Sequence, residues 1–122
     1  MLPIKGVYEI AIRVKDLARA EAFYKDVLGF TEGLRDDRRN WLFLYAGGKA
    51  GMIVLQEDKG EWPPQHFAFA VAENDINGAA QMLKDKGVAV SGPVYHEWMK
   101  SVSVYFDDPD GHALELLALS AS

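Results

Sequence analysis

The sequence predicts an α+β fold in which a βαβββ module occurs twice. The first observation is an internal repeat, because a strand-like stretch beginning at Glu9 and another beginning at His66 each precede a helical pattern that ends in glycine, at Gly29 and Gly87. His66 follows Glu9 by 57 residues and Gly87 follows Gly29 by 58, so a nearly constant spacing relates the copies. The second observation is that the sequence after each helix contains three further strand-like stretches. A repeat of this length indicates one supersecondary module used twice.

The first copy opens with a strand over residues 7–14, where bulky apolar residues alternate with Glu9 and other smaller or polar residues. Asp16 is the predicted N-cap of the helix that follows, and Gly29 supplies the left-handed residue at its end. The second copy repeats the plan. Its strand covers residues 66–71, and its helix is capped by Asn74 or Asp75 and ends at Gly87.

Three strands are predicted after each helix because short apolar runs alternate there with turn residues. The adjacent prolines at 63 and 64 suit neither a helix nor a central strand, so residues 59–64 are predicted to link two modules at about 5–58 and 65–120 within one domain, 1–122. The predicted strands cover residues 30–35, 40–46 and 51–57 in the first copy, and 89–95, 101–106 and 112–119 in the second.

Composition narrows the classes of function. A chain of 122 residues is long enough for one domain with a real core. The net charge of −5, without a run of like charges, argues against a nucleic acid or a membrane as partner. No cysteine is present, so any metal must be held by nitrogen and oxygen ligands. The N-terminal residues form neither a signal peptide nor a membrane span, so we expect a cytoplasmic protein.

Aligning the two copies brings four positions into register, occupied by Glu9, Val54, His66 and Glu115. Three of these residues are able to bind a divalent cation, whereas the valine is inert. Glu115 also interrupts an apolar strand, where a buried carboxylate is costly unless it is paired, hydrogen-bonded or bound to a cation. One shared metal ion explains the three residues together.

Each of the three has a simpler explanation when taken alone. Glu9 fits a solvated residue on an edge strand. His66 fits a histidine at a strand end that is hydrogen-bonded to backbone, and Glu115 fits an ion pair with Arg13 or Lys100. One metal ion bound by all three residues accounts for these repeat-equivalent positions more simply than three independent explanations do.

Other residues are candidates for contact with a substrate. Ser103 and Tyr105 alternate with apolar residues, so they are expected to share the face of the sheet that carries Glu115. The loop before them combines a titratable group with apolar side chains. Its candidate substrate-binding residues are His96, Trp98 and Met99.

The whole arrangement resembles the vicinal oxygen chelate superfamily, which includes glyoxalase I, fosfomycin-resistance proteins, bleomycin-resistance proteins and extradiol dioxygenases. The segments that carry the resemblance are residues 12–17, 23–30, 66–69 and 105–116. The resemblance implies that each module curls into half of an open barrel and that paired modules enclose a metal. It places the metal ligands on Glu9, His66 and Glu115. It also implies a homodimer in which Glu9 of one chain completes a site with His66 and Glu115 of the other.

Departures from the known branches limit the reaction that can be inferred. Glyoxalase I and related epimerases place a fourth ligand where this chain has Val54. Extradiol dioxygenases use two histidines and one carboxylate, whereas this set has one histidine. Thiol-transferring fosfomycin enzymes gather lysine, serine and arginine around a phosphonate, and the corresponding loop here, residues 98–101, holds only Lys100 and a serine.

The sequence therefore predicts a metal-dependent protein that acts on a small oxygenated substrate. Mn, Fe, Ni or Zn would serve as a Lewis acid that stabilises an enolate or oxyanion, with isomerase or lyase chemistry favoured and with Glu9 and Glu115 as catalytic residues. Glu9 or His96 is the candidate general base. One alternative is a metal-free binding protein of the bleomycin-resistance type, with a cavity floored by alanines such as Ala68. The other alternative is an extradiol-type dioxygenase.

Overall fold

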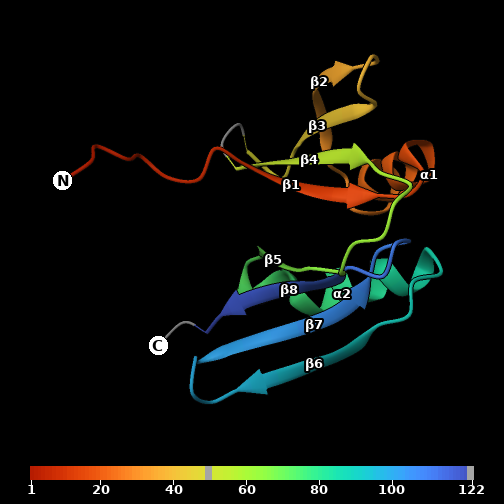
Figure 1. Cartoon of the computed structure of the whole chain (residues 1–122). Helices are drawn as coiled ribbons and strands as arrows, with labels where there is room; N and C mark the ends of the chain where they lie inside the picture. Colours follow the sequence, from red (N-terminus) through yellow and green to blue (C-terminus); the bar gives the residue numbers. More distant parts are fainter. Residues whose placement is uncertain (49–50, 121–122) are drawn as a thin grey trace. The chain divides into compact units, whose positions relative to one another are not determined.

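The computed structural model describes residues 1–48 and 51–120 (Figure 1). Its elements are β1 (Glu9–Val14), α1 (Leu17–Ala22), the π-helix η1 (Phe23–Val27), β2 (Thr31–Asp36), β3 (Trp41–Tyr45), β4 (Met52–Glu57), β5 (His66–Ala70), the 3-10 helix η2 (Glu73–Asp75), α2 (Ile76–Asp85), β6 (Ser91–His96), β7 (Ser101–Asp107) and β8 (Ala113–Leu119).

The chain divides into two compact units, Met1–Pro63 and Pro64–Ser122. Each contains a four-stranded sheet, with the order β1-β4-β3-β2 in the first and β5-β8-β7-β6 in the second. In both sheets the first strand pairs in parallel with the last, and the remaining pairs are antiparallel. The predicted α+β fold of two βαβββ modules with mixed sheets is confirmed.

In the first unit, α1 packs on the sheet through contacts with β3 and β4. The side chain of Asp16 accepts a hydrogen bond from the backbone N–H of Arg19, so the predicted N-cap is confirmed. The predicted helix is not regular throughout, because its second half, Phe23–Val27, is a π-helix around the fully buried Tyr24. Gly29 follows with a φ of 78°, as its left-handed role requires.

In the second unit, α2 contacts β6, β7 and β8 and lies behind the sheet in Figure 1. Asp75 occupies the predicted N-cap position, but its side chain makes no capping hydrogen bond, and a 3-10 turn precedes the helix. Ile76 and Leu83 are buried beneath the helix, and Gly87 ends it with a φ of 84°.

The strands lie within two residues of their predicted bounds. The largest difference is at β1, which begins at Glu9 rather than at residue 7, and at β6, which begins at Ser91 rather than at residue 89. The pair Gly47 and Gly48 marks the hairpin expected between β3 and β4, and the two residues after it, 49–50, lie outside the described residues. Within the described residues, no helix is both long and apolar enough to cross a membrane.

Candidate metal-binding site

His66 is the first residue of β5, where the parallel register places it beside Ala113 at the start of β8. Its Nδ1 lies 3.0 Å from the carbonyl oxygen of Ala113. A carbonyl oxygen only accepts hydrogen bonds, so Nδ1 carries a proton and donates it. The orientation of the ring is therefore fixed by this bond, and 54% of the side chain remains exposed.

Glu115 lies in the middle of β8, between Ala68 on β5 and Tyr105 on β7. The residue is only 7% exposed, so its carboxylate needs partners. Ser103 Oγ donates a hydrogen bond of 2.6 Å to Oε2, and Oε1 lies 3.0 Å from Nε2 of His66. These partners differ from the ion pair with Arg13 or Lys100 considered from the sequence.

The contact between His66 and Glu115 requires a positive charge or a proton between the two facing atoms. Because Nδ1 is committed to Ala113, the neutral imidazole presents the lone pair of Nε2 to a carboxylate oxygen, and two lone pairs at 3.0 Å repel. A proton on Nε2 or on the carboxyl oxygen, or a shared cation, removes the repulsion. Two ligand atoms at about 2.1 Å from one metal ion, at a right angle, are about 3.0 Å apart, so the pair fits two neighbouring positions of a metal ion.

The surroundings of the pair match those of known metal ligands. Ligating histidines usually donate their other N–H to a carbonyl or carboxylate, and ligating carboxylates are themselves hydrogen-bonded. Ala113 and Ser103 provide these two supports. The residues therefore fit a divalent cation such as Mn²⁺, Fe²⁺, Ni²⁺ or Zn²⁺, for which nitrogen and oxygen donors are suited.

The strand registers confirm which positions of the two units correspond. Glu9 pairs with Met52 as His66 pairs with Ala113, and Val54 pairs with Ala11 as Glu115 pairs with Ala68. Glu9 is exposed on β1, at the edge of the first sheet, and Val54 is fully buried.

The structure brings together two of the three predicted ligands. Across residues 1–48 and 51–120, no three histidine or carboxylate side chains gather as a metal site. His66 and Glu115 are adjacent, and the contribution of Glu9 stays a prediction.

Ser103 and Tyr105 lie on the face of the sheet that carries Glu115, as the alternation predicts. The hydroxyl of Tyr105 lies 2.7 Å from Nε2 of His96, and the two rings meet edge to face. Two of the predicted substrate-contacting residues thus form a hydrogen-bonded pair, next to the strand position of Glu115.

Trp98 and Met99 lie in the turn between β6 and β7. Trp98 is 84% exposed, and Met99 is exposed to a lesser degree. Lys100 in the same turn lies 2.7 Å from a carboxylate oxygen of Glu97, and its ammonium holds the pKa of Glu97 below the ordinary value. Contact of Trp98 or Met99 with a substrate stays a prediction.

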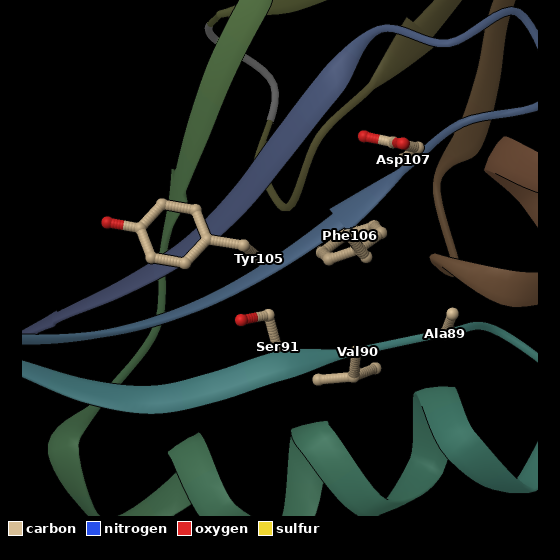
Figure 2. A pocket seen from close by; sticks show the side chains of 6 residues that line it. All are labelled: Ala89, Val90, Ser91, Tyr105, Phe106 and Asp107. Atoms are coloured by element: carbon tan, nitrogen blue, oxygen red, sulfur yellow. The ribbon is translucent and has the colours of Figure 1, made fainter.

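A hollow of about 300 Å³ lies between the start of β6 and the end of β7 (Figure 2). Tyr105 borders it, and Figure 2 shows the phenol hydroxyl pointing away from Phe106 and Asp107. Of the residues that line it, only Tyr105 was a candidate from the sequence. The lining residues are Ala89, Val90, Ser91, Tyr105, Phe106 and Asp107.

Comparisons with known proteins agree with the fold. Residues 6–116 match the model of the Glyoxalase/Bleomycin resistance protein/Dioxygenase superfamily. The solved structure of integron cassette protein HFX_CASS4, from the mobile metagenome of the Halifax Harbour sewage outfall, is 52% identical, with a TM-score of 0.91 over 95% of this chain and 100% of that chain. Glutathione transferase FosA from Serratia marcescens is 30% identical over 93% of this chain and 80% of its own length.

A third relative, metallothiol transferase FosB from Staphylococcus epidermidis, is 31% identical over 94% of this chain and 82% of its own length. The resemblance found in the sequence motifs is thereby confirmed. The chain belongs to the Glyoxalase/Bleomycin resistance protein/Dioxygenase superfamily.

Proposed function

We propose that the protein is a divalent-metal-dependent enzyme that acts on a small oxygenated substrate, with His66, Glu115 and Glu9 as the metal ligands. One observation carries the proposal: Nε2 of His66 faces Oε1 of Glu115 at 3.0 Å while Nδ1 is committed to a backbone carbonyl. The similarity to a metallothiol transferase supports it from outside the structure.

The third ligand, Glu9, comes from a second copy of the chain in this proposal. Glu9 is the repeat-equivalent of His66 and is exposed on an edge strand, so it is accessible to another subunit. Two ionised carboxylates and one neutral imidazole balance the charge of a divalent cation and leave neighbouring coordination positions for substrate oxygens. A two-fold homodimer would then hold two sites.

The chain's own residues have separate tasks at this site. When bound, the metal supplies a Lewis acid that stabilises a developing enolate or alkoxide. Ser103 holds one oxygen of Glu115 by a hydrogen bond, which leaves the other oxygen to face His66. Tyr105 offers a hydroxyl on the same face, with His96 as its partner, to hydrogen-bond a substrate oxygen.

Isomerase or lyase chemistry is the reaction type that we favour. Residues 98–101 hold a single basic side chain, Lys100, which pairs with Glu97, so this loop lacks the lysine and arginine cluster that thiol-transferring fosfomycin enzymes place around a phosphonate. The second candidate is thiol transfer, which the identity to glutathione transferase FosA and metallothiol transferase FosB favours. Assays with glutathione as co-substrate separate the two reactions.

Metal binding itself is tested first. Protein purified without chelators is assayed for metal content, and the metal-free protein is titrated with Mn²⁺ while free Mn²⁺ is followed by electron paramagnetic resonance. We expect one ion per chain, and a loss of affinity of at least about tenfold for His66→Gln and for Glu115→Gln. His96→Gln is the matched control, because it makes the same change in a histidine of the same sheet that lies outside the proposed ligands.

A wild-type protein without stoichiometric metal, whose affinity for small apolar compounds is unchanged by Glu115→Gln, would instead support the metal-free binding alternative. Oxygen consumption with catechols would support the dioxygenase alternative.

A further inference from the structure

His112 lies in the turn between β7 and β8 and is 0% exposed, although it carries two polar ring nitrogens. Its Nδ1 accepts a hydrogen bond of 2.9 Å from the backbone N–H of Gln65, the residue that directly precedes His66. The turn is thus bonded to a segment 47 residues away in the sequence.

The bond from His112 belongs to a set of three that join the starts of β5 and β8. The backbone N–H of Ala113 donates to the carbonyl of Gln65 at 2.9 Å. The carbonyl of Ala113 in turn lies 3.0 Å from Nδ1 of His66. Both backbone groups of Gln65 are therefore anchored, and the ring of the next residue is anchored as well.

The backbone of His112 is itself held within the turn, and its ring packs against Phe67. Asp108, which is almost fully buried, accepts hydrogen bonds through Oδ1 from the backbone N–H groups of Asp110 and His112, each at 2.9 Å. The backbone N–H of Asp108 donates to the carbonyl of His112 at 3.0 Å. The ring of Phe67 packs edge to face against the imidazole. The acceptor Nδ1 therefore sits at a fixed place relative to β5.

The first unit provides an internal comparison. There the backbone N–H of Met52 donates to the carbonyl of Tyr8 at 2.8 Å, which is the bond equivalent to that between Ala113 and Gln65. The residue equivalent to His112 is Gly51, which has no side chain to accept a bond. The first and last strands of a unit therefore pair here without an imidazole. The additional bond, from Gln65 to His112, occurs in the unit that carries the proposed ligand His66.

We propose that His112 is a positioning residue that fixes the backbone before His66, so that the ring of His66 keeps Nδ1 on Ala113 and Nε2 directed at Glu115. The inference rests on the proposed metal site. His112 acts through Gln65, whose backbone N–H donates a hydrogen bond to Nδ1 of its ring.

The test compares two variants of similar polarity in the full chain. His112→Asn places an amide oxygen near the position of Nδ1, whereas His112→Gln places its amide near the position of Nε2. Two readouts are used: the affinity for Mn²⁺, and the tautomer of His66 in the metal-free protein from long-range ¹H–¹⁵N correlation spectra. Leu83→Ala, in the buried face of α2, controls for a general loss of stability in the same unit.

We expect His112→Gln to weaken Mn²⁺ binding about ten- to a hundredfold and to mix the tautomers of His66, while His112→Asn keeps most of the affinity and the Nδ1–H form. Leu83→Ala should lower the melting temperature and leave both readouts unchanged. Wild-type affinity and an unchanged tautomer in His112→Gln would overturn the inference. If the wild type binds no Mn²⁺, the proposed function fails, and the tautomer of His66 still decides the role of His112.

Discussion

The hydroxyl oxygen of Tyr105 lies 2.7 Å from Nε2 of His96, and this contact joins β6 to β7 on the face of the sheet that carries Glu115. The two rings are arranged edge to face, with centroids 6.1 Å apart. The orientation of the phenol is therefore set by its own unit before any substrate arrives. Preorganised donors of this kind cost little reordering when a ligand binds.

Tyr105→Phe removes the hydroxyl and leaves the ring in place. We expect a loss of about 1 kcal/mol in the free energy of unfolding, since one partly buried hydrogen bond is removed. Urea unfolding of Tyr105→Phe, His96→Ala and the double variant measures how the two changes couple. Tyr8→Phe, in an exposed tyrosine that precedes β1, is the control. Strictly additive losses for Tyr105→Phe and His96→Ala would show that the contact contributes nothing.

Val54→Glu places a carboxylate at the position of the first unit that corresponds to Glu115. We expect a loss of roughly 3 kcal/mol in stability, because Val54 is fully buried and a charge there has no partner. By register, Trp41 occupies the place that Ser103 holds in the second unit, so the hydroxyl that supports Glu115 has no counterpart. Thermal unfolding of Val54→Glu and of the uncharged Val54→Gln separates charge from shape; equal losses would refute the electrostatic explanation.

An ion-pair network in the first unit should make its stability depend on acid. Arg35 bonds both oxygens of Glu21, at 3.1 and 2.6 Å, and both oxygens of Glu32, at 2.8 and 3.4 Å. The Arg35 guanidinium, followed by the Lys25 ammonium, lowers the pKa of Glu32 from 4.5 to about 2. A lowered carboxyl pKa adds stability above the unfolded value, and that stability is lost as the pH falls from about 4.5 towards about 2.

Arg35→Gln should therefore be less stable than the wild type at pH 7, and the difference should shrink as the pH falls through this window. Unfolding midpoints measured from pH 7 to pH 2 check the expectation. Arg38→Gln, in an exposed arginine of the turn between β2 and β3, should show a smaller and flatter difference. A gap for Arg35→Gln that stays constant down to pH 2 would contradict the role of the network.

Subunit mixing tests the origin of the third ligand. Glu9→Ala and His66→Ala each remove a ligand from both sites of a homodimer. If the ligands come from different subunits, a heterodimer of the two variants regains one intact site, so Mn²⁺ binding returns at about half of the wild-type stoichiometry per dimer. Mass spectrometry verifies the exchange of subunits. No recovery after verified exchange would place Glu9 and His66 of one chain in the same site.

Much of the fold was predictable because its signals are local. Alternation with a period of two residues placed Ser103 and Tyr105 on the face of Glu115, and the internal repeat placed the four equivalent positions in register. The π-helix around Tyr24 was not predicted, since apolar residues spaced for an α-helix also suit a wider turn. The 3-10 turn before α2 was missed because Asn74 and Asp75 are equally common at caps and in turns.

The site was predictable only in its residue types. The sequence singled out His66 and Glu115, but the tautomer that aims one at the other depends on the carbonyl of Ala113, which no side-chain pattern reveals. The bond to His112 was not predictable, because its partner, Gln65, is distant in the chain and donates through its backbone.

The two copies of the repeat have become unequal, since Trp41, Gly51 and Val54 occupy the places that Ser103, His112 and Glu115 hold in the second. Sensitivity to substitution at these three places should therefore be greater in the second unit than in the first. The second unit holds a buried serine, histidine and glutamate at these places, whereas the first holds a tryptophan, a glycine and a valine. Apolar substitutions should therefore be tolerated better at Val54 than at Glu115, whose loss leaves the hydroxyl of Ser103 and Nε2 of His66 without their partner.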